Sequence, residues 1–191
     1  MSLAFIGLGS NLGDGCRNLQ KAWQIAGNNP AITTLAISSP YLTRPVNKKA
    51  WAAEGKRLSD QWFTNAVGVL ETVLPPQHLL ESLKKLELTM GRDSCKTVNR
   101  PVDLDILYYD DLVISRAELD IPHPEIQQRR FVLIPLAEIA PDHQHPVTGL
   151  TTRQMIRALP PCEGINIRQM DWTNTTGDFV TKTGVERRES S

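Results

Sequence analysis

The chain has 191 residues, a length that fits one domain with a substantial hydrophobic core. Its 21 basic and 21 acidic side chains leave no net charge, which argues against a general affinity for nucleic acid or an anionic membrane. The three cysteines show no CxxC spacing, and no apolar run reaches the roughly 20 residues of a membrane span. These features predict a soluble, cytoplasmic protein without a disulfide framework or zinc site.

In chain order, the first predicted element is a strand at 3–7, which is followed by the turn-rich segment GSNLGD. Apolar residues then recur at helical spacing over 19–26, and this pattern stops at GNNP. A long strand rich in β-branched residues is expected at 31–43. The polar stretch that follows, 44–60, is longer than an ordinary connection, which is typical of a functional or mobile loop.

The middle of the chain predicts a strand, a helix and another strand. The strand is FTNAVGVLET at 63–72, and the helix is PPQHLLESLKKLELTM at 75–90, where two prolines precede a stripe of leucines. A polar loop at 91–100 leads into NRPVDLDILYYDD, whose apolar run predicts the next strand. Because this loop has little apolar surface to bury, we expect it to be mobile without ligand.

The last part of the chain predicts smaller elements, namely a returning strand at 112–115, helices at 129–140 and 151–160, and a final strand near 165–170. The order strand–helix–strand–strand–helix–strand is that of a ferredoxin-like α+β sandwich. We expect a mostly antiparallel sheet with helices on one face and a site on the other. The domain should span 1–172, and a polar C-terminal tail should span 173–191.

Two carboxylates, Asp103 and Asp105, stand one residue apart at the head of the strand in NRPVDLDILYYDD. Residues two apart on a strand point to the same side, so both carboxylates should emerge together while Leu104 enters the core. Two like charges this close are tolerable when Mg²⁺ lies between them, because Mg²⁺ takes one or two carboxylates and completes its shell with water and phosphate oxygens. The alternative is a pair of solvated aspartates at a strand edge.

Cationic side chains surround this pair in the sequence. They are Arg92, Lys96 and Arg100 upstream, and His123, Arg129 and Arg130 downstream. Each one alone could be an ordinary turn or helix residue. Acidic metal ligands flanked by cationic donors are nevertheless what phosphoryl transfer requires, because metal ions bridge the phosphates and cations offset the charge that develops.

Six segments occur in the order found in the 6-hydroxymethyl-7,8-dihydropterin pyrophosphokinases, and the resemblance covers about residues 3–160. The segments are GSNLGD, SSPYLTRPV, FTNAV, LELTMGR, RPVDLDIL and IPHPEIQQRRFVLIPLAEIAP. This resemblance implies a folate-pathway enzyme that moves pyrophosphate from ATP to a pterin alcohol and releases AMP. The resemblance also implies that the partners of the protein are these two small-molecule substrates, ATP and the pterin alcohol. We favour a monomer.

The resemblance implies that Asp103 and Asp105 ligate two Mg²⁺ ions, so that metal rather than protein balances the paired charges. Arg92 and Arg100 match basic catalytic residues of a loop that closes over the triphosphate. The positions that match nucleotide contacts are Glu87, Ile106, His123 and Arg129. Glu87 could equally have a plain surface role on its helix.

On the pterin side, Thr43 and Val46 match a loop that reads the heterocycle, and Asn65 matches an amide that pairs with the ring edge. Phe63 and Phe131 match two aromatic residues that sandwich the ring. By their positions alone, both phenylalanines would be assigned to a hydrophobic core. GSNLGD, which lacks the lysine of a phosphate-binding P-loop, is expected to be a tight turn on the pterin side.

The chain departs from the family in the segment KTVNR, where an RWGPR-like segment with a tryptophan is usual, and its loop is shorter. A degenerate paralogue, or a ferredoxin-like ligand-binding module without turnover, is therefore an alternative. A nucleotidyltransferase is a further alternative, but it would usually need a third, distant carboxylate for which the sequence has no motif.

Overall fold

The computed structural model describes residues 1–44, 62–92, 99–160 and 167–173. These residues form a six-stranded sheet in the order β5-β1-β4-β3-β8, and β2 also pairs with β4. The pairings within this sheet are antiparallel. The strands are β1 (Ser2–Ser10), β2 (Ile32–Ile37), β3 (Tyr41–Thr43), β4 (Phe63–Thr72), β5 (Asp103–Tyr109) and β8 (Ile167–Gln169).

The helices of the described part are α1 (Gly15–Gly27), α3 (Pro76–Thr89), α4 (Arg130–Ile139) and α5 (Thr152–Ala158), with a short 3₁₀ turn at Ile126–Gln128. The Asp14 side chain caps α1 by accepting the Arg17 N–H at 3.1 Å. Pro76 opens α3, and prolines at the start of this helix are what the sequence predicts. The antiparallel sheet with its βαββαβ order confirms the ferredoxin-like α+β fold.

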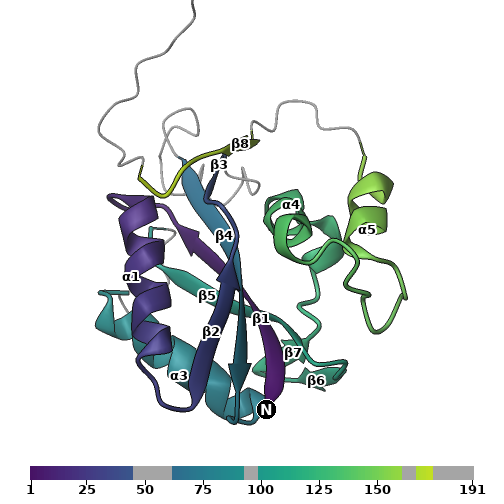
Figure 1. The fold of residues 1–191 in the computed structure, drawn as a ribbon, viewed down its shortest axis with the longest axis horizontal. Coiled ribbons are helices and arrows are strands. Elements are labelled where there is room, and N and C mark those ends of the chain that lie inside the picture. Colours follow the sequence, from purple (N-terminus) through teal and green to yellow (C-terminus); the bar gives the residue numbers. More distant parts are fainter. Residues whose placement is uncertain (45–61, 93–98, 161–166, 174–191) are drawn as a thin grey trace, which may run out of the picture.

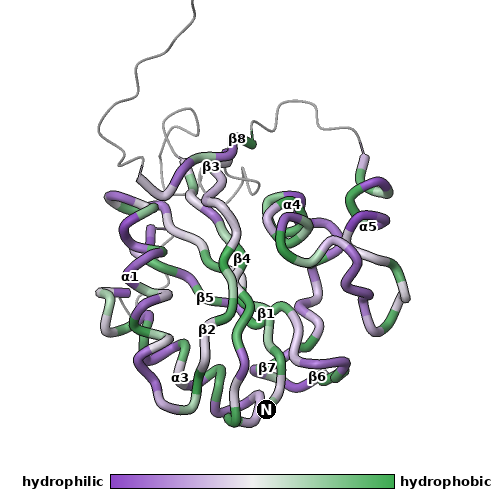
Figure 2. The backbone as a smooth tube through the Cα atoms, viewed as in Figure 1, coloured by the Kyte–Doolittle hydropathy of each residue, from purple (hydrophilic) through white to green (hydrophobic). Residues whose placement is uncertain are grey.

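Helices cover both faces of the sheet, so the expectation that they cover only one face is wrong. α1 and α3 lie on one side, and α4 and α5 lie on the other (Figure 1). The reason is visible in β1, where Ile6 belongs to the core beneath α1 and α3 while its neighbour Phe5 belongs to the core with Leu133 and Leu136 of α4. Figure 2 shows the hydrophobic stretches of β1, β4 and α4 that supply these two cores.

The predicted strand at 31–43 is divided into β2 and β3, which both pair with β4. Between them, Ser38 replaces regular strand pairing: its N–H donates to the Val67 carbonyl at 2.9 Å, and its hydroxyl accepts the Val67 N–H at 3.1 Å. Pro40 has no N–H to continue a ladder, which explains a break here. The predicted final strand is confirmed as β8, which pairs with β3.

The predicted returning strand near 112–115 is found as β6 (Ile114–Arg116). It pairs with β7 (Leu119–Ile121) in a separate two-stranded sheet. Trp172, near the end of the described chain, packs against the core beneath α1, and its carbonyl accepts a hydrogen bond from Gln20 at 3.2 Å.

Candidate active site

Asp103 and Asp105 emerge from the same face of β5. Leu104 between them is 2% exposed and belongs to the core beneath α1 and α3, whereas both aspartates are partly exposed. β1 lies beside β5 with Gly9 opposite Asp103 and Gly7 opposite Asp105. The sheet therefore presents the two carboxylates next to a strip of β1 that carries no side chains. The predicted geometry of the pair is confirmed.

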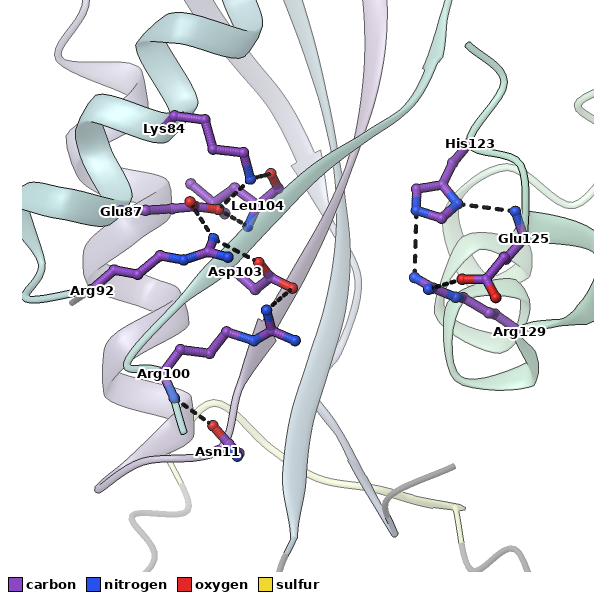
Figure 3. Close-up of polar contacts among 10 residues, drawn as sticks. All are labelled: Asn11, Lys84, Glu87, Arg92, Arg100, Asp103, Leu104, His123, Glu125 and Arg129. Atoms are coloured by element: carbon purple, nitrogen blue, oxygen red, sulfur yellow. Dashed lines mark hydrogen bonds and ion pairs between the residues drawn. The ribbon is translucent and has the colours of Figure 1, made fainter. Parts of the chain in front are cut away.

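The protein itself balances the charge of Asp103. Its Oδ1 lies 2.8 Å from a guanidinium nitrogen of Arg92, and its Oδ2 lies 3.3 Å from one of Arg100 (Figure 3). The expectation that metal rather than protein balances this pair leaves out these two arginines, which are additional partners of Asp103. Both arginines precede β5 in the chain and carry side chains long enough to reach a carboxylate at its head.

Glu87 is 1% exposed, so the alternative of a plain surface role is wrong. One carboxylate oxygen accepts the Leu104 N–H at 2.7 Å and lies 2.9 Å from the Lys84 ammonium, while the other pairs with Arg92. Lys84 also donates to the Leu104 carbonyl at 3.3 Å. β5 is an edge strand of the sheet, so no further strand pairs with its outer side. Glu87 and Lys84 of α3 instead form hydrogen bonds with the outward-facing backbone groups of Leu104.

Arg92 is a cation shared between the buried Glu87 and the proposed metal ligand Asp103. Its partial burial acts to lower its pKa, but the attraction of Asp103 and Glu87 prevails and raises the pKa of Arg92 above its ordinary value. Arg92 therefore stays charged at any physiological pH.

His123 and Arg129 form a second group at the start of α4, with 3.4 Å between the His123 Nε2 and a guanidinium nitrogen (Figure 3). The backbone N–H of His123 donates to the Leu107 carbonyl at 3.0 Å, which connects this group to β5. Burial lowers the pKa of His123, and the nearby Asp105 only partly opposes this, so the ring is neutral near pH 7. Glu125 pairs with Arg129.

The tautomer of His123 follows from its contacts. Two donors contact this ring: the Glu125 backbone N–H lies 3.2 Å from Nδ1, and an Arg129 guanidinium nitrogen lies 3.4 Å from Nε2. A neutral ring accepts at one nitrogen only, and we assign the acceptor to Nδ1 because that contact is the shorter one, which places the proton on Nε2. Two N–H groups, from His123 and Arg129, then face each other. An anionic oxygen between them could accept from both, which makes this pair suitable for a phosphate group.

Thr43 and Asn65 form the third group, on β3 and β4. The Asn65 amide nitrogen donates to the Thr43 hydroxyl at 2.8 Å, and both residues are buried. Phe63 lies directly opposite Thr43 in the ladder and is half-buried. Gly9 pairs with both Asn65 and Asp103, so these two side chains lie in one row on either side of a glycine. A Cβ atom at Gly9 would lie 3.4 Å from the Asn65 Oδ1.

Phe131, in the first turn of α4, is partly buried against the core of that helix and lies 5.7 Å from the Arg129 guanidinium, measured to the ring centroid. Ile106 is 4% exposed with its side chain in the opposite core, so only its backbone is available to a ligand. Val46 lies outside the described residues, as does the loop segment 93–98 in which mobility is expected.

Sequence reasoning missed two contributors to this site. Lys84 stands three residues before Glu87 on α3, a spacing that would have indicated their ion pair. Asn11 belongs to the GSNLGD segment but contacts Arg100, at the end of the polar loop. No sequence signal links these two positions, because the contact depends on how β1 lies against β5.

The model of the 7,8-dihydro-6-hydroxymethylpterin-pyrophosphokinase (HPPK) family matches residues 5–141. The chain belongs to the HPPK family. A Methylorubrum extorquens protein named 2-amino-4-hydroxy-6-hydroxymethyldihydropteridine pyrophosphokinase is 37% identical over 163 residues, which cover 84% of this chain and 96% of the relative. A Pseudomonas aeruginosa protein of the same name is 34% identical over 162 residues, which cover 84% of this chain and 93% of the relative.

Among solved structures, an HPPK-DHPS in complex with substrates has a TM-score of 0.62 and 13% sequence identity to this chain. The match covers 82% of this chain but 44% of the longer one, and it supports the fold alone. In the part of the chain that the structure describes, no helix is both long and apolar enough to span a membrane.

Proposed function

We propose that this protein transfers pyrophosphate from ATP to 6-hydroxymethyl-7,8-dihydropterin in folate biosynthesis. The pterin hydroxymethyl oxygen attacks the β-phosphorus of ATP, the bond from that phosphorus to the α,β-bridging oxygen breaks, and AMP leaves as the hydroxyl proton is released. The observation that carries the proposal is the Asp103–Asp105 pair, which lies on one face of β5 within the family match. Nothing in the comparisons favours a degenerate paralogue.

The reaction is tested by incubating the protein with ATP, Mg²⁺ and the pterin alcohol and separating the nucleotides. We expect AMP together with the pterin diphosphate. ADP would indicate an ordinary kinase, released pyrophosphate would indicate a nucleotidyltransferase, and the absence of turnover would indicate a binding module. Any of these three results would overturn the proposal.

The donor set of the site suits Mg²⁺. Asp103 and Asp105 offer carboxylate oxygens from a single strand, and within the described ranges no group of three or more His, Cys, Asp or Glu side chains could hold a metal. Mg²⁺ needs no such group, because it is commonly bound by one or two carboxylates together with substrate phosphates. We propose that these two residues hold two Mg²⁺ ions, which would neutralise the charge of the triphosphate.

The cations of the site would hold the triphosphate. Arg92 and Arg100 already lie against Asp103, and the proposal assigns them to the phosphates when nucleotide and metal are bound. The facing N–H groups of His123 and Arg129 suit a further phosphate oxygen. Catalysis then rests on positioning and electrostatic stabilisation, which supply most of the rate enhancement in phosphoryl-type transfer. We assign no general base.

The backbone of β5 offers a place for adenine. Peptide groups of residues two apart on a strand point to the same side, so those of Ile106 face the same open edge as those of Leu104. Glu87 already receives three donors, so we propose that it supports this strand and Arg92 rather than contacting the nucleotide.

We place the pterin over the row formed by Asn65 and Gly9, between Phe63 and Phe131, with Thr43 and Val46 at its edge. The Asn65 amide already donates to Thr43, which fixes its orientation, and the side-chain-free Gly9 leaves room beside its oxygen. The row joins Asn65 to Asp103, so a pterin bound there would lie beside the proposed metal ligands.

Asn65→Ala should weaken pterin binding by about 1–3 kcal/mol, because a buried polar partner of the ring is lost. The affinity for ATP should change much less. Calorimetric titration of each ligand measures both effects, and Gln20→Ala, which removes an amide from α1 on the other side of the sheet, serves as the control. Equal losses for the two ligands would show that the pterin site lies elsewhere.

We further propose that the catalytic domain spans 1–172, that 173–191 is an appendage, and that the enzyme is a cytoplasmic monomer. The contacts of Trp172 with α1 and its core support a domain that reaches this residue. The balanced charge and the cysteine pattern support the location.

A further inference from the structure

Asn11 follows β1 directly and holds the backbone of Arg100 from both sides. Its Oδ1 accepts the Arg100 N–H at 2.8 Å (Figure 3). Its own backbone N–H donates to the Arg100 carbonyl at 3.3 Å. Its amide nitrogen also donates to the Asn99 Oδ1 at 3.3 Å. One residue of the GSNLGD segment thus bonds both polar backbone groups of Arg100.

These contacts lie where regular strand pairing has ended. The ladder between β1 and β5 stops at the pair Gly9 and Asp103, and Pro101 has no N–H with which to extend it. Val102 is buried in the core beneath α1 and α3 and holds the chain just before Asp103, but it makes no contact that fixes the polar backbone groups of Arg100 in the way Asn11 does. Asn11 takes over the role of the missing ladder bonds and fixes the backbone three residues before the first proposed metal ligand.

The position of the Arg100 backbone matters because the guanidinium group lies at the end of a long side chain. A shift of the backbone therefore moves the guanidinium group as well. The side chain is 32% exposed and lies 3.3 Å from Asp103, so where it reaches depends both on this ion pair and on where its backbone is held. When the backbone of an arginine is fixed, its guanidinium group can occupy fewer positions than when the backbone is free to move. A larger fraction of those positions then lies near the phosphate. Misplacement of such a group by about 1 Å can cost about a hundredfold in rate.

We propose that Asn11 is a positioning residue, which acts through the backbone of Arg100 to set where that guanidinium meets the triphosphate. This inference rests on the proposed function for the role of Arg100. The contacts themselves do not depend on that role, so they can be tested separately by amide hydrogen exchange.

The test compares Asn11→Ala, Asn11→Asp and Asn18→Ala. Asn11→Ala removes the side-chain bonds, and Asn11→Asp keeps an oxygen that can accept the Arg100 N–H. Asn18→Ala is the matched control, because the Asn18 amide bonds Ser10 and the Leu12 carbonyl in the same turn. The measurements are exchange of the Arg100 amide by NMR, the single-turnover rate, the affinity for ATP, and thermal unfolding.

In Asn11→Ala the Arg100 amide should exchange at least about tenfold faster, and the single-turnover rate should fall about 10- to 100-fold. The affinity for ATP should change less than about threefold, because the contact of Arg100 matters most in the transition state. Asn11→Asp should keep the amide protected and retain more activity than Asn11→Ala. Asn18→Ala, which loosens the same turn without removing a bond to Arg100, should change the exchange and the rate much less than Asn11→Ala does.

Two results would overturn the inference: unchanged exchange of the Arg100 amide in Asn11→Ala, or faster exchange with an unchanged single-turnover rate. If Asn11→Ala failed to fold, an unprotected Arg100 amide in a folded Asn11→Asp would overturn it equally. Failure of the proposed function is distinct from these results, because it would appear as absence of AMP formation by the wild-type protein itself.

Discussion

Asp105→Asn is expected to lower turnover by about 10²–10³-fold, the loss that follows removal of one preorganised electrostatic group. The substitution keeps the size of the side chain and removes the charge that a metal ion needs. Asp105 is partly exposed on β5, so its replacement should leave the unfolding temperature nearly unchanged. Steady-state assays with saturating Mg²⁺ and thermal unfolding measure the two effects.

Asp111→Asn is the matched control, because Asp111 is exposed and lies just past the end of β5. It should retain full activity. Near-wild-type turnover in Asp105→Asn would exclude the two-metal proposal.

Asp103→Asn should differ from Asp105→Asn in stability. It should also lose activity, but it leaves Arg92 and Arg100 with a neutral partner in place of a carboxylate. Part-exposed ion pairs contribute up to about 1 kcal/mol each, so we expect a small drop in the free energy of unfolding. Chemical denaturation of the two variants, side by side, would measure this difference, and equal stability would mean that the ion pairs contribute nothing.

Glu87→Ala should destabilise the fold by about 3 kcal/mol, because it leaves the Leu104 N–H and two cations without their buried partner. Glu87→Gln should cost less, since an amide oxygen can still accept the Leu104 N–H. Denaturant unfolding measures both variants. Glu81→Ala, on the exposed side of the same helix, provides the control and should be close to wild type.

The same variants distinguish two roles of Glu87, namely stabilisation of β5 and direct contact with the nucleotide. If Glu87 acts through β5 and Arg92, Glu87→Gln should lower the affinity for ATP less than it lowers turnover. A loss confined to ATP affinity, with stability unchanged, would instead support a direct nucleotide contact.

Much of the site follows from local sequence. The period of two along a strand places Asp103 and Asp105 on one face and Leu104 in the core, whatever the rest of the fold does. The helix with prolines at its start and the βαββαβ order are also local patterns, and the structure confirms them. The covering of the second face was missed, although the apolar runs at 3–8 in β1 and 66–70 in β4 are continuous rather than alternating, which is typical of strands that are buried on both faces.

The sequence alone determined the carboxylate pair, the order of the elements and the family, because these depend on residues close together or on segments matched in order. Only the tertiary structure decided what balances Asp103, what buries Glu87 and what holds Arg100. The Leu104–Glu87 bond joins residues 17 apart and the Arg100–Asn11 bond joins residues 89 apart. Such contacts arise from the edge position of β5 and from the point where its ladder with β1 ends, and both are properties of the assembled sheet.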